Sequence, residues 1–259
     1  MTLSTGLTVF ATKLSSGLNR ASAPDATITW PTTHTELATM MGLATAPTAF
    51  WNMGGAASTF TDTAGGKNLV LWGTDSSVRD STSAALNDNK TVSIPADNWW
   101  NGGYRAGLND LEVTSAQSVV LMIVLEKIDA VPTGTPRNSI GSSAYELRQA
   151  GNTVWWQTST AGGQNAQSVA MAAAANKAHT LIGVLNRATN SFKLITSEGN
   201  SAGQAITGTL GTHTTAIGIG KAIANGRRCK IGFAAVWIGA GAEQDFEAGE
   251  TAFSAIVGW

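Results

Sequence analysis

The sequence predicts an all-β protein, a two-sheet antiparallel jelly-roll sandwich with an N-terminal arm and a short C-terminal helix. Only 13% of the residues are charged, 29 are glycine, and short apolar runs recur with Gly- and Asn-containing turns between them. Average soluble proteins carry about 25% charged residues, and short strands separated by such turns are typical of sandwiches and barrels. A chain of 259 residues can still form a single domain of this class.

The first part of the chain, residues 1–47, is rich in Thr, Ser and Ala and has weak periodicity. One short helix is expected there, because Thr33 and Glu36 have the spacing of a capping box and Gly42 can end the helix. We interpret residues 1–47 as an arm that docks or assembles the protein, and residues 48–259 as the sandwich. An arm that packs on its own chain is the alternative left open.

From residue 48 onward the pattern alternates between strand and turn. Residues 118–125 are nearly all apolar, which predicts a central strand buried on both faces. Hairpins are expected around Ala150-Gly151-Asn152 and around residues 186–190, where turn residues separate apolar runs. Further strands are expected at residues 49–53, 58–63, 68–72, 90–95, 216–220 and 230–238.

The last segment, residues 242–257, combines an apolar stripe with acidic residues at its start. Phe246 and Phe253 have helical spacing, and acidic groups stabilise a helix N-terminus. We therefore predict a short helix packed on the sandwich.

Four segments occur in an order shared with a known family. They are Phe50-Trp51-Asn52-Met53 with the turn at residues 62–69, then residues 86–95, residues 178–184, and residues 217–220 with 232–238. Over residues 48–259 the chain resembles laminin-G-like members of the concanavalin A-like lectin/glucanase superfamily, which implies that family's sandwich. Ala178 stands where the family usually has Trp, and Ala235 where an acidic residue is common, so calcium-linked chemistry is not implied.

Domains of this family behind a short polar N-terminal segment resemble those of bacteriophage virion proteins. The resemblance implies a non-enzymatic structural or adhesion protein, either a capsid decoration protein or a tail component, assembled in the host cytoplasm. Its expected partners are other virion proteins and copies of itself, and a host-surface glycan is a further possible ligand.

Three aromatic residues are candidates for binding a carbohydrate or a protein partner. Trp99, Trp100 and Tyr104 lie in a polar, Gly-rich stretch that we interpret as a loop, and flat aromatic faces there can stack on a sugar or on an apolar surface. A carbohydrate-binding module is therefore the second hypothesis, and packing of these rings onto the end of the sandwich is the structural alternative. In the predicted strand at residues 154–157, Trp155 and Trp156 point to opposite faces.

A glycoside hydrolase is the third hypothesis, and it depends on Glu243, Asp245 and Glu247. Retaining glycosidases of this fold resemble one another in a Glu-x-Asp-x-Glu strand, where alternation places the carboxylates on one face. On a helix, residues two apart point in different directions. Because the segment falls in the expected final helix, we predict no catalytic residues and no enzyme.

Other partner classes are disfavoured. The net charge is −1 and no basic stretch could follow a phosphate backbone, so no nucleic acid is expected. Residues 119–125 form the longest apolar run, which is too short to span a bilayer, and the N-terminus lacks a signal-peptide pattern. We expect no metal and no cofactor, because the candidate ligands are scattered: Cys229, His34, His179, His213, Asp62, Asp75, Asp88 and Asp97.

Overall fold

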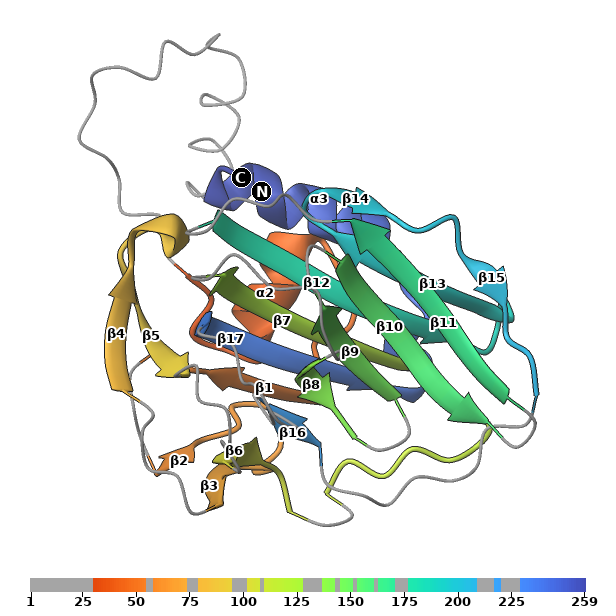
Figure 1. Cartoon of the computed structure of the whole chain (residues 1–259), viewed down its shortest axis with the longest axis horizontal. Coiled ribbons are helices and arrows are strands. Elements are labelled where there is room, and N and C mark those ends of the chain that lie inside the picture. The colour runs from red at the N-terminus through yellow and green to blue at the C-terminus, as the bar shows by residue number, and fades with distance from the viewer. Residues whose placement is uncertain are drawn as a thin grey trace, which may run out of the picture.

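The computed structural model describes residues 30–54, 58–73, 79–94, 102–107, 110–127, 137–142, 145–150, 153–160, 163–170, 177–208, 217–219 and 229–259. In these residues two antiparallel sheets face one another, and two α-helices lie against the outer side of one of them (Figure 1). The predicted all-β sandwich with a C-terminal helix is confirmed.

The first sheet has nine strands in the order β14-β13-β12-β7-β17-β5-β4, with β1 paired to β17 and β15 to β13. Its strands are β1 (Ala49–Asn52), β4 (Arg79–Ser83), β5 (Asn89–Ile94), β7 (Val119–Lys127), β12 (Lys177–Asn186), β13 (Ser191–Thr196), β14 (Gly199–Asn200), β15 (Gln204–Ala205) and β17 (Cys229–Ile238).

The second sheet has eight strands in the order β11-β10-β9-β8-β16-β6-β3-β2. They are β2 (Thr59–Phe60), β3 (Leu69–Gly73), β6 (Gly102–Arg105), β8 (Arg137–Gly141), β9 (Tyr145–Ala150), β10 (Thr153–Thr160), β11 (Gly163–Ala170) and β16 (Gly218–Ile219).

Strand β7 lies at the centre of the nine-stranded sheet, between β12 and β17. Its side chains alternate between two apolar clusters: Val119 and Leu121 point between the sheets, whereas Val120 and Met122 point to the outer side. The prediction of a central strand buried on both faces is therefore confirmed. The hairpins β9–β10 and β12–β13 also form where they were expected.

The helices are α2 (His34–Met41) and α3 (Phe246–Val257), and two short 3₁₀ helices, η1 (Ala84–Leu86) and η2 (Gly239–Ala242), connect strands. Thr33 accepts a hydrogen bond from the Glu36 backbone N–H, Glu36 accepts from Thr33, and Gly42 ends α2 at φ 65°. The predicted capping box is confirmed. Hydrogen bonds from Thr32 to the Glu36 carboxylate lower the pKa of that group. None of the helices in the described ranges is long and apolar enough to span a bilayer.

Residues 30–47 pack on the sandwich of their own chain, which is the alternative left open for this segment. Trp30, Leu37 and Met41 belong to the outer apolar cluster of the nine-stranded sheet, together with Phe253 of α3. The ring centroid of Trp30 lies 5.8 Å from that of Trp259, the last residue. Residues 1–29 lie outside the described residues, so a docking role for the arm stays a prediction.

Candidate functional site

The outer faces of the two sheets differ in what covers them. Helices α2 and α3 pack on the outer face of the nine-stranded sheet, whereas in the described part of the chain no helix lies on the outer face of the eight-stranded sheet (Figure 1). Side chains that point outward from β9, β10 and β11 therefore form the surface on which a ligand site can be sought.

Two adjacent tryptophans on β10 point to opposite sides of this sheet. Trp156 is fully buried, donates its indole N–H to the Val184 carbonyl at 3.1 Å, and stacks on Phe192 with a centroid distance of 5.3 Å. Gly183 leaves room for the ring, because a Cβ at that position would come within 2.4 Å of it. Trp155 instead points outward and is half-buried.

The indole N–H of Trp155 has no hydrogen-bond partner among the described residues. The buried N–H groups of Trp30 and Trp259 have none there either, whereas three other buried indoles do. Trp51, Trp156 and Trp237 each donate to a backbone carbonyl. Tryptophan N–H groups usually find an acceptor when they are buried. Trp155 is only half-buried, so part of its indole is open to a ligand.

Polar side chains flank Trp155 on the side of β9. The strand register places Arg148 directly opposite Trp155 and Glu146 opposite Gln157. The Glu146 carboxylate pairs with Arg148 and accepts a hydrogen bond of 3.0 Å from Gln157 Nε2. Glu146 is only 5% exposed, and the Arg148 side chain is 25% exposed. The buried carboxylate thus fixes two polar side chains beside the ring.

Small side chains flank Trp155 on the other side. Ser168 lies opposite Trp155 on β11, and Ala166 and Ala170 share its face because side chains alternate along a strand. None of the three is large enough to cover the indole. The site is therefore a half-buried indole ring with small side chains of β11 on one side and polar side chains on the other.

The structure describes only part of the site that was predicted from the sequence. Trp99 and Trp100 lie outside the described residues. Tyr104 lies on β6 rather than in a loop, is 1% exposed, and packs edge-on against Phe60 with a centroid distance of 4.7 Å. Pairing of β6 with β3 and β16 turns Tyr104 toward the core. The structure therefore places the Tyr104 ring in the core, and ligand binding by the predicted site stays a prediction.

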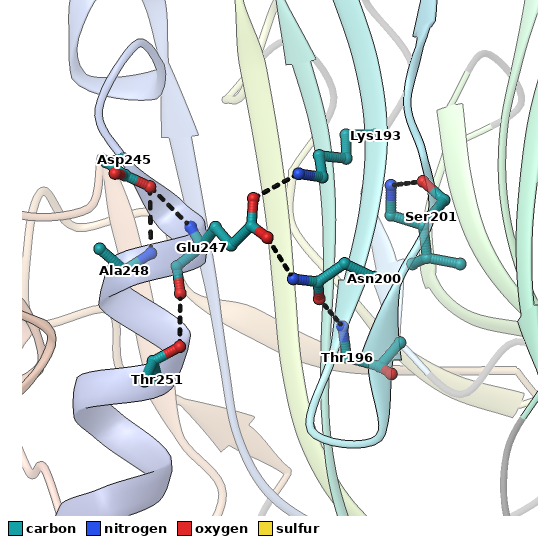
Figure 2. A network of polar contacts seen from close by, with 9 residues as sticks. Lys193, Thr196, Asn200, Ser201, Asp245, Glu247, Ala248 and Thr251 are labelled. Carbon is teal, nitrogen blue, oxygen red and sulfur yellow. Dashed lines mark hydrogen bonds and ion pairs between the residues drawn. The ribbon is translucent and has the colours of Figure 1, made fainter.

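The acidic segment at residues 243–247 does not form a strand. Glu243 ends η2 and accepts a hydrogen bond of 2.7 Å from Ser118 Oγ. Asp245 caps α3 by accepting from the backbone N–H groups of its first turn. Figure 2 shows Glu247 turned the other way, toward Lys193 and Asn200, with which its carboxylate interacts.

These contacts give each of the three carboxylates its own structural role, so the constellation required by the glycosidase hypothesis is not assembled. Hydrogen bonds from Lys193 and Asn200 lower the pKa of Glu247, which disfavours a role as proton donor.

Asp62, a candidate cation ligand, instead organises the turn between β2 and β3. It is 5% exposed, and its two carboxylate oxygens accept hydrogen bonds from the backbone N–H groups of Phe50, Ala64, Gly65 and Lys67 at 2.9–3.0 Å. These bonds occupy the lone pairs that a metal ion would need.

The remaining candidate metal ligands do not converge. His34 lies near Thr63 and His179 near Glu198, while Asp75, Asp97 and His213 lie outside the described residues. Within the described ranges, no three potential metal-ligating residues come together.

Comparisons with known proteins support the fold. No family model matches the sequence, and no curated protein matches it. Among solved structures, the binding domain of Paraclostridial Mosquitocidal Protein 1 superposes with a TM-score of 0.59 at 10% identity, over 80% of this chain and 52% of that one. The botulinum neurotoxin serotype D binding domain gives a TM-score of 0.59 at 13% identity, over 81% and 51%.

A third structure concerns botulinum neurotoxin type C, whose cell entry depends on interaction with two ganglioside molecules; it has a TM-score of 0.59 at 10% identity, over 81% of this chain and 51% of that one. This chain therefore spans about half the length of these neighbours. At such identities the likeness shows the β-sandwich fold alone.

Proposed function

We propose that this chain is a non-enzymatic binding domain that recognises a carbohydrate on the outer face of its eight-stranded sheet. The observation that supports the proposal is Trp155, a half-buried indole on the face that no described helix covers, whose N–H has no hydrogen-bond partner within the described residues. The divergent contacts of the acidic segment at 243–247 favour binding over catalysis.

The chemistry of the site fits a sugar. The face of an indole is the negative end of its quadrupole, and it attracts the weakly positive C–H groups on one side of a pyranose ring. Arg148 and Gln157 are positioned to hydrogen-bond hydroxyl groups at the edge of that ring. One aromatic platform with a few convergent polar groups is the usual composition of a small-ligand site.

A protein partner fits this face less well. Protein–protein interfaces are enriched in several large side chains at their centre, whereas Trp155 is bordered by Ala166, Ser168 and Ala170. The ganglioside dependence stated for the type C neurotoxin gives further support to a carbohydrate ligand.

We further propose that the domain is an adhesion component of a virion. The support is the resemblance of residues 48–259, behind a polar N-terminal segment, to bacteriophage virion domains. Quantitative mass spectrometry of purified particles tests the location. The chain should be present at a constant ratio to the major capsid protein, and its absence from purified particles would contradict the proposal.

The experiment for the ligand is a glycan array probed with the full chain and two variants. Trp155→Ala should lose at least about 90% of the signal for the bound glycans, because stacking and the indole donor are both removed. Val70→Ala is the matched control, since Val70 is 50% exposed on β3, at a distance from Trp155 in the strand order of the same sheet. A folded Trp155→Ala variant with the wild-type glycan profile would contradict the proposal, as would a wild-type protein that binds no glycan.

A further inference from the structure

The two sheets protect their edges unequally. In the described part of the chain the edge strands are β14, β15, β1 and β4 in one sheet, and β11 and β2 in the other. Strands β14, β15 and β2 are two residues long, and β4 carries Arg79 and Asp80. On the outer side of β1, the Phe50 N–H donates to Asp62 and the Phe50 carbonyl accepts from Thr63. Strand β11 is eight residues long, with the sequence GQNAQSVA, which contains no charged residue and no proline. In natural sheets, edge strands are usually prevented from pairing with other chains by being short or by carrying charged residues or proline. Strand β11 has none of these features.

The backbone groups on the free side of β11 can be assigned from the hairpin that it forms with β10. Thr160 pairs with Gly163 across a two-residue connection, so these residues must bond to each other, and the bonding alternates from there. It follows that the N–H and C=O groups of Gln164, Ala166, Ser168 and Ala170 point away from β10. No backbone hydrogen bond from another segment within the described ranges reaches them.

The position of β11 is fixed by hydrogen bonds between the Asn165 side chain and the backbone of Thr207. Asn165 is 1% exposed, donates to the Thr207 carbonyl at 3.0 Å, and accepts from the Thr207 N–H at 2.9 Å. These two bonds tie β11 to the chain segment that follows β15. The strand is thus fixed from the core side, and no backbone hydrogen bond from the described segments occupies its outer N–H and C=O groups.

We propose that β11 pairs antiparallel with β11 of a second copy of this chain, across a two-fold axis near Gln167. The register pairs Ala166 of one copy with Ser168 of the other, and Gln164 with Ala170. All four outward residues then find partners, whereas an axis at Ala166 leaves Ala170 without one. The two eight-stranded sheets become one continuous sheet.

A second copy is the occupant that this edge fits best. An antiparallel pair of identical strands is symmetric about a two-fold axis, as in the commonest class of homodimer. The free N–H and C=O groups of one β11 strand therefore match those of a second β11 strand. The side chains that meet across the axis are small or uncharged, which avoids the like-charge repulsion that opposite residues would otherwise cause.

The pairing has a consequence for the proposed carbohydrate site, and this consequence alone rests on the proposed function. Trp155 lies one strand from β11, and a two-fold axis perpendicular to the sheet keeps both outer faces on the same side. The two indoles would lie roughly 16 Å apart, from three strand spacings of about 4.8 Å and an offset of two residues. A dimer would therefore bind a repeating glycan with avidity.

The test is the mass of the full chain in solution, measured by sedimentation equilibrium. The wild type should be a dimer of the 26.7 kDa chain. Ser168→Pro should be a monomer, because proline removes an outward N–H that β10 does not use. Ala166→Lys should weaken dimerisation by about tenfold or more, since the two lysines lie diagonally across the axis. Ala202→Lys is the matched control: it adds the same charge at an exposed position after β14 and should remain dimeric.

Each outcome decides the proposal. A monomeric wild type overturns it, and so does a dimer that both edge variants retain. If circular dichroism shows that Ser168→Pro is unfolded, Ala166→Lys decides alone. A wild-type dimer that binds no glycan leaves the pairing standing and removes the proposed function, which separates the two.

The register has a test of its own. Under the proposed axis, the two copies of residue 167 form a non-hydrogen-bonded pair, whose Cα distance of about 4.5 Å suits a disulfide. Gln167→Cys should therefore cross-link under mild oxidation. The wild type should not, because burial raises the pKa of the Cys229 thiol to about 12. A dimeric Gln167→Cys variant that fails to cross-link overturns this register.

Discussion

The outer faces of the two sheets differ in composition and in cover. On the nine-stranded sheet, Ile182, Phe233 and Trp237 point outward and are buried under α2 and α3. On the eight-stranded sheet, Trp155 and Gln157 point outward and are only half-buried. The same strand alternation thus produces a second core on one side of the molecule and a solvent-facing surface on the other. Stability should depend on the first face and recognition on the second.

The largest effect is expected from breaking the covered face. Phe253 of α3 is fully buried, and its ring packs edge-on against Phe233 at a centroid distance of 5.7 Å. Phe253→Ala should lower the free energy of unfolding by about 3–5 kcal/mol. Urea denaturation measures the change, and a loss below about 1 kcal/mol would show that the helical layer does not stabilise the sheet.

A smaller loss is expected inside the sandwich, at the glycine beneath Trp156. A Cβ on Gly183 would lie 2.4 Å from the ring, and overpacking of this kind typically costs about 1–3 kcal/mol. Gly183→Ala should therefore lower the urea midpoint and displace Trp156, with a changed near-UV circular dichroism spectrum. An unchanged spectrum would mean that the ring is not held as tightly as the contact indicates.

The open face should tolerate loss of its aromatic residue. Trp155 is half-buried and makes no indole hydrogen bond to any residue in the described ranges, so Trp155→Ala should change the free energy of unfolding by less than about 1 kcal/mol. Trp156→Ala, at the neighbouring buried position, should cost about 3–5 kcal/mol. Equal losses in the two variants would contradict the proposed division between the inner and outer faces.

The smallest effect concerns the contact of α3 with β13 and β14 (Figure 2). Interaction with Lys193 and Asn200 lowers the pKa of Glu247 in the folded state. The contribution of this carboxylate to the free energy of unfolding is therefore present above its pKa in the unfolded chain, and it is lost as the pH falls through its pKa in the folded protein. Glu247→Gln should cost a few tenths of a kcal/mol near pH 7, as an exposed pair does, and little at low pH. A loss that grows toward low pH would have the wrong sign.

Much of the covered face could be predicted from the sequence, because its signals are local. Residues 118–125 are apolar at every position but the first, and a strand buried on both faces needs that pattern. The capping box at Thr33 and Glu36 fixes the start of α2 within one turn. The acidic residues before α3 likewise predict the start of a helix from local sequence alone.

The open face was harder to predict because it depends on pairing. Strand β11 is polar and contains only one β-branched residue, and Gly102–Gly103 give β6 little strand propensity of its own; both strands form because neighbours bond to them. Alternation predicted that one of Trp155 and Trp156 faces outward, but not which. Arg148 joined the site only through the register of β9 with β10, a relation that residue types do not encode.

The alternation along β10 also has an evolutionary consequence. Trp156 is tied to Val184, Phe192 and Gly183, so a substitution there requires compensation at other positions. Trp155 has no such ties within the described residues, and neither do its small neighbours on β11. Under the proposed function, ligand preference can therefore diverge by single substitutions among relatives that keep the same scaffold, and their sequence variation should concentrate on the outward positions of β9, β10 and β11.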